Sequence, residues 1–82
     1  MNALTKAEAR MGNDIARQFA HLPAAQAAEA IARHLEAFWD PRMRRELEAL
    51  AAEGDDSLDP LLVAAAGRLA AHASRSEPDA QP

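Results

Sequence analysis

Apolar residues recur along the chain at helical spacing, and the first such stripe predicts a helix over residues 6–21. The stripe consists of Met11, Ile15, Phe19 and Leu22, with Lys6, Arg10, Asn13 and Arg17 on the opposite side. Residues three or four positions apart lie on one side of a helix, so this pattern indicates an amphipathic helix. Thr5 and Glu8 have the spacing of a capping box, which predicts where this helix begins.

A second, more regular stripe predicts a helix that follows Pro23 and extends to Phe38. Its apolar members are Ala24, Ala28, Ile31, Leu35 and Phe38, and its polar members are Gln26, Glu29, Arg33 and Glu36. Proline suits the first turn of a helix because its missing N–H is not needed there. Trp39 lies at the edge of the apolar stripe, which leaves two interpretations open: it fills the core between two helices, or it anchors a partner protein.

Two Asp-Pro pairs predict the starts of the remaining helices. The residue before proline is pushed out of the helical region, aspartate is a favourable N-cap, and proline is favourable at the first helical position. A third helix is therefore expected from Pro41 to Gly54, a glycine suited to the left-handed position that ends a helix. Four of its residues are expected to face inward: Met43, Leu47, Leu50 and Ala51.

The fourth predicted helix begins after Asp59-Pro60 and covers residues 61–71. Arg68 is its only charged residue, so this helix is apolar on nearly all sides. A helix of this kind is normally buried on nearly all sides. Either alanine is tolerated on its exposed face or a second chain covers that face, and the sequence leaves both interpretations open.

Together these elements, with no convincing strand, predict an all-α fold of about four short helices, two of them joined at an Asp-Pro kink. The 82 residues leave room for one domain, expected over residues 1–73, with a disordered tail over residues 74–82. Hydrophobic residues make up 49% of the chain, but many are alanines, which bury little area. A partner that completes the core is therefore a reasonable expectation.

Composition excludes several kinds of chemistry. The chain has no cysteine, which rules out disulfides, thiolate catalysis and Cys-ligated metal centres. Its formal net charge of −4 argues against nucleic-acid binding, which depends on neutralising phosphates. No apolar run approaches the roughly 20 residues that span a bilayer, and the first ten residues lack the apolar stretch of a signal peptide. We therefore expect a cytoplasmic protein with no membrane segment.

No arrangement of residues indicates a catalytic, cofactor or metal site. The three histidines, His21, His34 and His72, do not have ligand spacing, and His34 is expected to be half-buried with a hydrogen-bond partner. The acidic residues between the last two helices read as a solvated loop. We therefore expect no catalytic, cofactor-binding or metal-binding residues.

One unbroken run stands out as a candidate partner-binding site. It comprises Phe38, Trp39, Pro41, Arg42, Met43, Arg44 and Arg45 together with the capping residue Asp40. Arginine in the first turn of a helix faces the positive end of the helix dipole, at a cost of about 0.3–1 kcal/mol each. Pairs with Glu46 and Glu48 return only about 0.2–0.5 kcal/mol each. Because the cluster gains little locally, we expect it to bind carboxylates or phosphates of a partner, the alternative being an ordinary solvated face.

This run, from His34 to Arg44, resembles the signature of the delta subunit of NAD-dependent formate dehydrogenase. Met11-Gly12-Asn13-Asp14-Ile15-Ala16 followed by Phe19, and Leu58-Asp59-Pro60-Leu61, are similar to other parts of the family in the same order. The resemblance covers about residues 4–69. It departs at Gln18, where the family often has a second aromatic residue, which leaves part of the contact surface of the first helix in doubt.

The resemblance implies an accessory subunit without redox centres. Its partner would be the catalytic alpha subunit of a cytoplasmic, molybdenum-containing enzyme that also has beta and gamma subunits. That complex is expected to carry a molybdopterin guanine dinucleotide cofactor, iron–sulfur clusters, FMN and NAD. Two rival interpretations are a chaperone for cofactor insertion that leaves the finished enzyme, and a small DNA-binding regulator of helix-turn-helix type.

Overall fold

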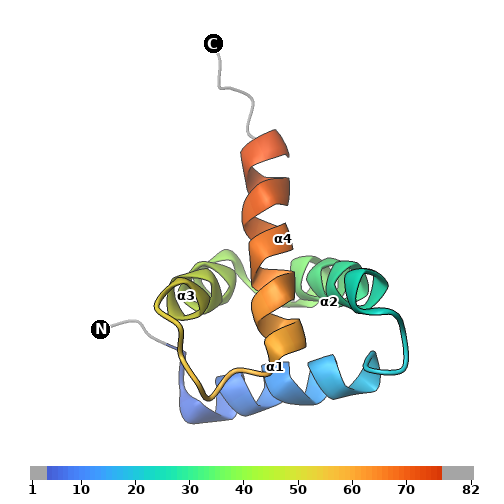
Figure 1. The fold of residues 1–82 in the computed structure, drawn as a ribbon. Coiled ribbons are helices and arrows are strands. Elements are labelled where there is room, and N and C mark those ends of the chain that lie inside the picture. Colours follow the sequence, from blue (N-terminus) through green and yellow to red (C-terminus); the bar gives the residue numbers. More distant parts are fainter. Residues whose placement is uncertain (1–3, 77–82) are drawn as a thin grey trace.

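The computed structural model describes residues 4–76 and confirms the predicted all-α fold. Its helices are α1 (Lys6–Gln18), α2 (Ala24–Phe38), α3 (Pro41–Ala52) and α4 (Pro60–Ser76). In Figure 1, α4 passes between α2 and α3, and α1 crosses beneath them. Most contacts between helices are those of α4 with α2 and with α3, so α4 is the central element.

The core lies where α4 meets the other three helices. Its largest fully buried side chains are Ile31, Leu35, Leu47 and Leu62. Much of the remaining buried surface comes from alanines such as Ala32 and Ala65, as the composition suggested. Small side chains let the helices approach closely but bury little apolar area each, so the core is thin.

Local capping signals position the helix ends as predicted. The backbone N–H of Glu8 donates to Thr5 Oγ1, and the backbone N–H of Thr5 donates to Glu8 Oε1. Both hydrogen bonds are 3.0 Å long, and together they complete the capping box. Asp40 accepts from the Met43 N–H at 2.8 Å, and Pro41 occupies the first helical position of α3. Gly54 has a φ of 76°, the left-handed conformation expected just after α3.

Two helix ends differ from the prediction. α1 ends at Gln18, three residues early, because Phe19, Ala20 and Leu22 form short i→i+3 hydrogen bonds that turn the chain before Pro23. Pro23 itself precedes the first helical residue. α4 continues to Ser76, five residues beyond the predicted end, and no proline or glycine interrupts it there. The rest of the predicted tail, residues 77–82, lies outside the described residues.

α1 is held in place by a close contact with α4 and by two hydrogen bonds to the loop that precedes α4. A Cβ on Gly12 would lie only 2.9 Å from Leu62 Cδ2 and 3.2 Å from Trp39 Cη2, so glycine permits this approach. Next to it, Asn13 Nδ2 donates to Ser57 O at 2.8 Å, and Asn13 Oδ1 accepts from the Asp59 N–H at 2.7 Å. These bonds fix the loop between α3 and α4 to α1.

Candidate functional site

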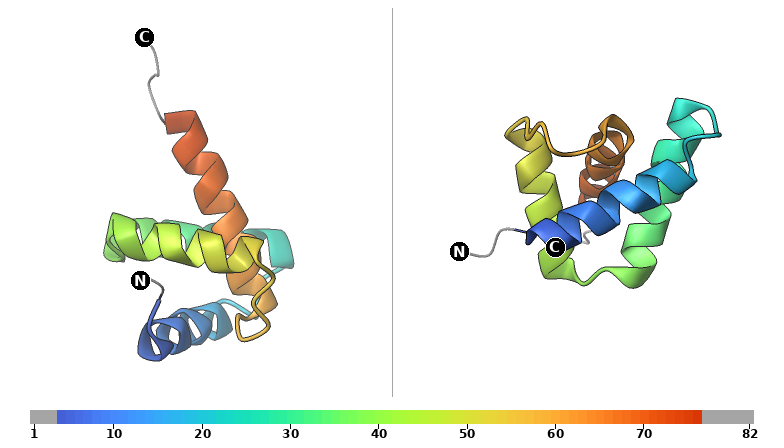
Figure 2. Two further views of the ribbon diagram at one scale, coloured as in Figure 1. Left: turned by 90° about the vertical axis from the view of Figure 1, so that its left-hand side faces the viewer. Right: turned by 90° about the horizontal axis from the view of Figure 1, so that it is seen from below.

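The predicted site lies at the corner where α2 passes into α3. Trp39 and Asp40 are extended, with ψ of 144° and 164°, and hydrogen bonds fix the chain on both sides. The Trp39 N–H donates to Leu35 O at 2.8 Å, and Asp40 caps α3. Seen from below in Figure 2 (right), this corner extends past α1. It is therefore both well defined and uncovered on that side.

Two of the predicted contact residues pack into or against the core. Trp39 is only 6% exposed and packs with the buried residues of α1, α2 and α4, while Met43 is partly buried against the same cluster. Of the two interpretations left open for Trp39, the structure therefore supports the core role. In this conformation the indole supports the shape of the corner and offers almost no surface to a partner.

Arg42 links α3 to α1. Its guanidinium donates to Glu46 Oε1 at 2.6 Å and to Glu8 Oε2 at 3.1 Å, and the Glu8 side chain is 21% exposed. The hydrogen bond from the Thr5 backbone, with Arg42 beside it, holds the pKa of Glu8 below its usual value. Arg42 therefore has a tertiary ion pair that its own helix could not reveal, because Glu8 is 34 positions away in sequence.

The other two arginines differ from each other. Arg44 Nη1 donates to the backbone carbonyl of Glu36 at 2.9 Å and so ties α3 to the last turns of α2. Arg45 is exposed and makes no hydrogen bond or ion pair within the part of the chain that the structure describes. Since two of the three guanidiniums are used inside the molecule, the cluster is poorly suited to lead a DNA recognition helix, which needs free cations.

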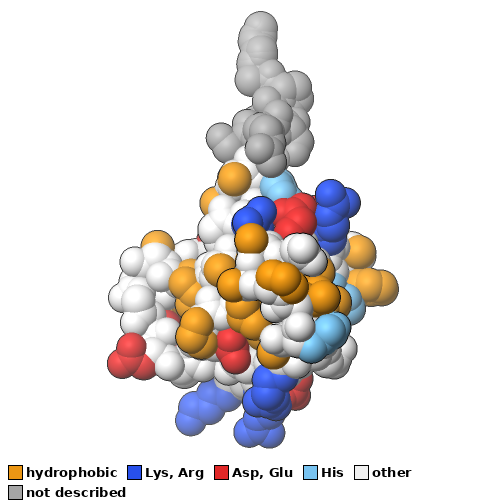
Figure 3. Space-filling model, turned by 45° about the vertical axis from the view of Figure 1, so that its right-hand side comes forward, with side chains coloured by type: hydrophobic (Ala, Val, Ile, Leu, Met, Phe, Trp, Pro, Cys, Tyr) orange, Lys and Arg blue, Asp and Glu red, His pale blue; other side chains and the backbone are white. Residues whose placement is uncertain are grey.

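Of the predicted contact residues, Phe38, Pro41 and Arg45 are exposed at the corner, next to the exposed cap Asp40. Phe38 is 75% exposed although it lies on the stripe that is buried further back along α2. Its ring lies 4.7 Å from that of His34, which is half-buried. Figure 3 shows a different face, around the start of α2, where further hydrophobic side chains reach the surface.

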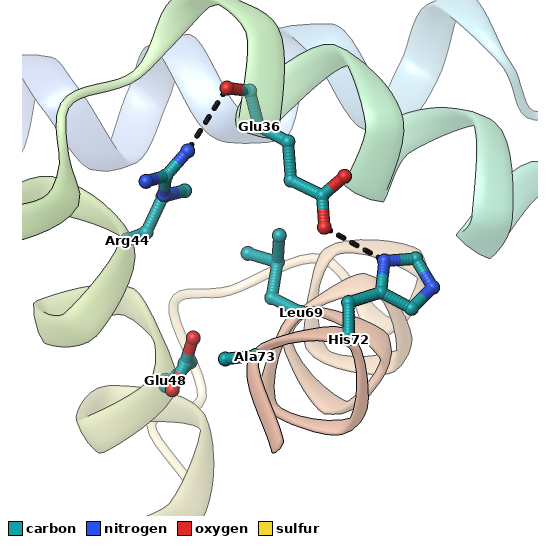
Figure 4. Close-up of a pocket in the computed structure, with 6 residues that line it drawn as sticks. All are labelled: Glu36, Arg44, Glu48, Leu69, His72 and Ala73. Carbon is teal, nitrogen blue, oxygen red and sulfur yellow. Dashed lines mark hydrogen bonds and ion pairs between the residues drawn. The ribbon is translucent and has the colours of Figure 1, made fainter. Parts of the chain in front are cut away.

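Behind the corner lies an open hollow of about 240 Å³ between α2, α3 and α4. Figure 4 shows Arg44 and Glu48 on the α3 side and Glu36 and His72 across from them. His72 Nδ1 lies 2.7 Å from Glu36 Oε2 and its Nε2 lies 3.3 Å from Glu29 Oε1, so these groups join α4 to α2. The hollow is polar and shallow, and its charges largely satisfy one another.

Glu48 is the exception. Burial raises the pKa of its carboxyl, and the attraction of Arg44 and Arg45 only partly offsets this. No hydrogen bond or ion pair to Glu48 is present among the described side chains. Glu48 also lines a second hollow, between α3 and α4.

The described residues hold no cluster of three or more potential metal ligands. None of the helices within residues 4–76 is long and apolar enough to cross a membrane. The largest hollow among those described here, about 400 Å³, lies over the outer face of α1 and is lined by Lys6, Arg10 and Arg17. Arg17 is paired with Asp14 there, so this face is a solvated surface with mixed charge.

Comparison with known families decides the assignment that the corner could not decide alone. The family model described as the delta subunit of NADH-dependent formate dehydrogenase, FdsD, matches residues 9–66. The chain belongs to this family. No curated protein and no solved structure gives a significant match. The match runs from the middle of α1 into α4 and includes the whole corner.

Within this delta-subunit family member, several important residues were not predicted from sequence. Glu8 was assigned only a capping role, and Asn13 only a polar position, yet both hold α1 in place. Their partners are far away along the chain, so no local pattern could reveal them. Glu48 was considered only as a local pair for an arginine, and Gly67 was given no role, although a glycine inside a helix is a visible signal.

Proposed function

We propose that this chain is a non-catalytic accessory subunit that binds the catalytic alpha subunit of a cytoplasmic NAD-dependent formate dehydrogenase. Membership of the delta-subunit family supports this, because a delta subunit is one part of a larger enzyme. In the proposed complex, the molybdopterin guanine dinucleotide cofactor, the iron–sulfur clusters, FMN and NAD belong to the alpha, beta and gamma subunits. This chain binds none of them, and it binds neither nucleic acid nor membrane.

The observation that carries the proposal is the exposure of Phe38 on a fixed corner. Large aromatic residues and arginines are the usual anchors of protein interfaces. Here Phe38 is 75% exposed, and Arg45 is exposed near the start of the next helix, α3. The contacts of Trp39, Arg42 and Arg44 hold the backbone of the corner in place. A surface that is already rigid loses little conformational entropy on binding, which favours affinity. We therefore revise the contact set to Phe38, Pro41 and Arg45.

Such a subunit would support assembly by mass action. A chain that binds the folded, cofactor-loaded alpha subunit but not its unfolded form stabilises the folded form by an amount that grows with its concentration. No chemical step by the accessory chain is needed for this. The expected consequence is a longer lifetime of the loaded enzyme on heating when the chain is present.

The test measures binding of purified variants to the alpha-containing complex isolated without this chain. Phe38→Ala and Arg45→Glu should each weaken binding by about 1–2 kcal/mol, roughly five- to thirty-fold in Kd. Arg10→Glu is the matched control, because it reverses an exposed charge on the outer face of α1. Circular dichroism checks that all three variants remain folded, as expected for exposed positions.

If both corner variants bind like the wild type, the corner is not the contact surface. If the wild-type chain does not bind the complex at all, the accessory role itself is wrong. Counting this chain per alpha subunit in the active, purified enzyme separates a permanent subunit from a chaperone: equal amounts support the first, and near absence supports the second.

A further inference from the structure

A second surface, between α3 and α4, has features that the chain's own packing does not explain. It is a groove of about 300 Å³ whose walls are mostly small apolar residues. These small residues include Ala51, Ala52, Val63, Gly67 and Ala70, and Glu48 also lines the groove. These residues belong to α3 and α4, the two helices whose arrangement Figure 1 shows.

Gly67 makes the groove deeper at a cost to the isolated chain. Glycine inside a helix is less stable than alanine by about 1 kcal/mol. A Cβ at Gly67 would meet no atom within 4 Å, so nothing in this chain requires the missing side chain. This contrasts with Gly12, where a Cβ would meet Leu62 and Trp39. A glycine with open space above it suits the close approach of another backbone.

Glu48 indicates the charge of whatever binds there. Its carboxyl is already partly desolvated, which raises its pKa, and the attraction of Arg44 and Arg45 only partly offsets this. An apolar segment covering the groove would desolvate this carboxylate further, which is unfavourable unless the segment also brings a cation. A second copy docked symmetrically would instead bring a second carboxylate toward the first. Charge therefore favours a different, basic partner.

The groove is also continuous with the surface proposed above to bind the alpha subunit. Pro41, Arg45, Glu48 and Ala52 are spaced i, i+4, i+7 and i+11, so they share one face of α3. A partner that contacts the corner at Pro41 and Arg45 can follow this face directly into the groove. The two surfaces can thus belong to one interface.

We propose that the α3–α4 groove receives an amphipathic helix of the formate dehydrogenase alpha subunit, with a Lys or Arg of that helix placed beside Glu48. This inference rests on the proposed function and names the contact that completes it. Docking of a helix into an apolar groove is a common recognition mode, in which small groove residues allow close packing and one charge pair fixes the register.

The first test compares two leucine substitutions on α4 by their Kd for the complex isolated without this chain. Gly67→Leu fills the groove and should weaken binding about ten-fold or more, a loss of the size found when an interface centre is disrupted. Ala64→Leu is the matched control, because Ala64 is exposed on α4 but does not line the groove, and it should bind within about two-fold of wild type. Neither should unfold the chain, which circular dichroism checks.

The second test addresses the charge and the identity of the occupant. Glu48→Lys should weaken binding, and reversal of the facing Lys or Arg in the alpha subunit to Glu should restore it. A photo-crosslinking amino acid at position 70 should identify that facing helix by mass spectrometry of the crosslinked complex. Crosslinks between two copies of this chain, or to a segment without a basic residue, overturn the proposal.

The two proposals fail in different ways. If Phe38→Ala weakens binding but Gly67→Leu does not, the groove inference is wrong and the accessory role stands. If the wild-type chain does not bind the complex, both are wrong.

Discussion

Replacing Gly67 with alanine is expected to stabilise the isolated chain, whereas the same replacement at Gly12 is expected to destabilise it. Both glycines lie inside helices, so both variants gain about 1 kcal/mol of helix propensity. At Gly67 nothing lies within 4 Å of the added Cβ, and the whole gain is retained. The difference between the two variants therefore measures the packing around Gly12 alone.

At Gly12 the added Cβ falls 2.9 Å from Leu62 Cδ2 and 3.2 Å from Trp39 Cη2. Both side chains are buried, at 0% and 6% exposure, so they cannot move aside without disturbing the core. Overpacking of this kind costs about 1–3 kcal/mol, which outweighs or cancels the propensity gain. Gly12→Ala should thus lie about 1–3 kcal/mol below Gly67→Ala in unfolding free energy.

Urea denaturation followed by circular dichroism measures this difference, provided that the two variants share the same slope m. In thermal unfolding, 1 kcal/mol corresponds to a shift of about 4–8 °C for a domain of this size. Equal stabilisation by both substitutions would refute the close approach of α1 to α4 and Trp39. Destabilisation by Gly67→Ala would show that the space above Gly67 is filled by the chain itself, which would remove the main argument for the groove.

Trp39→Ala should lower the unfolding free energy by about 3–5 kcal/mol, which is much of the stability of a domain of this size. We therefore expect the cooperative thermal transition to be lost, and a wild-type melting curve would contradict burial of the indole. Glu8→Gln and Glu48→Gln should have opposite effects on the dependence of stability on pH. Because the pKa of Glu8 lies below 4.5, its ionised form stabilises the fold above that pH and the effect is lost as pH falls through the lowered pKa, so Gln should flatten the acid limb. Because the pKa of Glu48 lies above 4.5, its ionised form opposes folding at neutral pH, so Gln should stabilise there and make no difference in acid. Urea midpoints from about pH 3 to pH 7 measure both, and parallel profiles for the two variants would contradict the assignment.

The parts of the fold that sequence predicted are those set by neighbours along the chain. The Thr5–Glu8 box, the Asp40–Pro41 start of α3 and the Gly54 stop each depend on residues within four positions of one another. Such signals are readable because the atoms that satisfy the backbone are close in sequence. Helix count and order followed from them together with the hydrophobic stripes.

The site was harder to predict because its roles depend on where helices cross. The stripe that contains Phe38 gives the direction of the side chain but not whether a neighbouring helix lies there. The end of α2 extends past α1, and Phe38 is exposed. Arg42 was expected to face a partner because it gains little from its own helix, whereas its decisive contact is with Glu8. A local accounting of charge cannot distinguish a distant part of the same chain from another protein.

A residue that is unfavourable in its own helix indicates a partner protein only when the rest of the chain does not compensate for it. Arg42 differs from Gly67 and Glu48 in this respect. At Arg42 the structure shows ion pairs with Glu46 and Glu8. At Gly67 the structure shows open space, and at Glu48 it shows a partly desolvated carboxyl whose pKa is raised despite the nearby arginines. Both features lower the stability of the isolated chain and both line one groove. In the proposed complex, a basic helix would offset both at once, so binding would stabilise the small subunit as well as the large one.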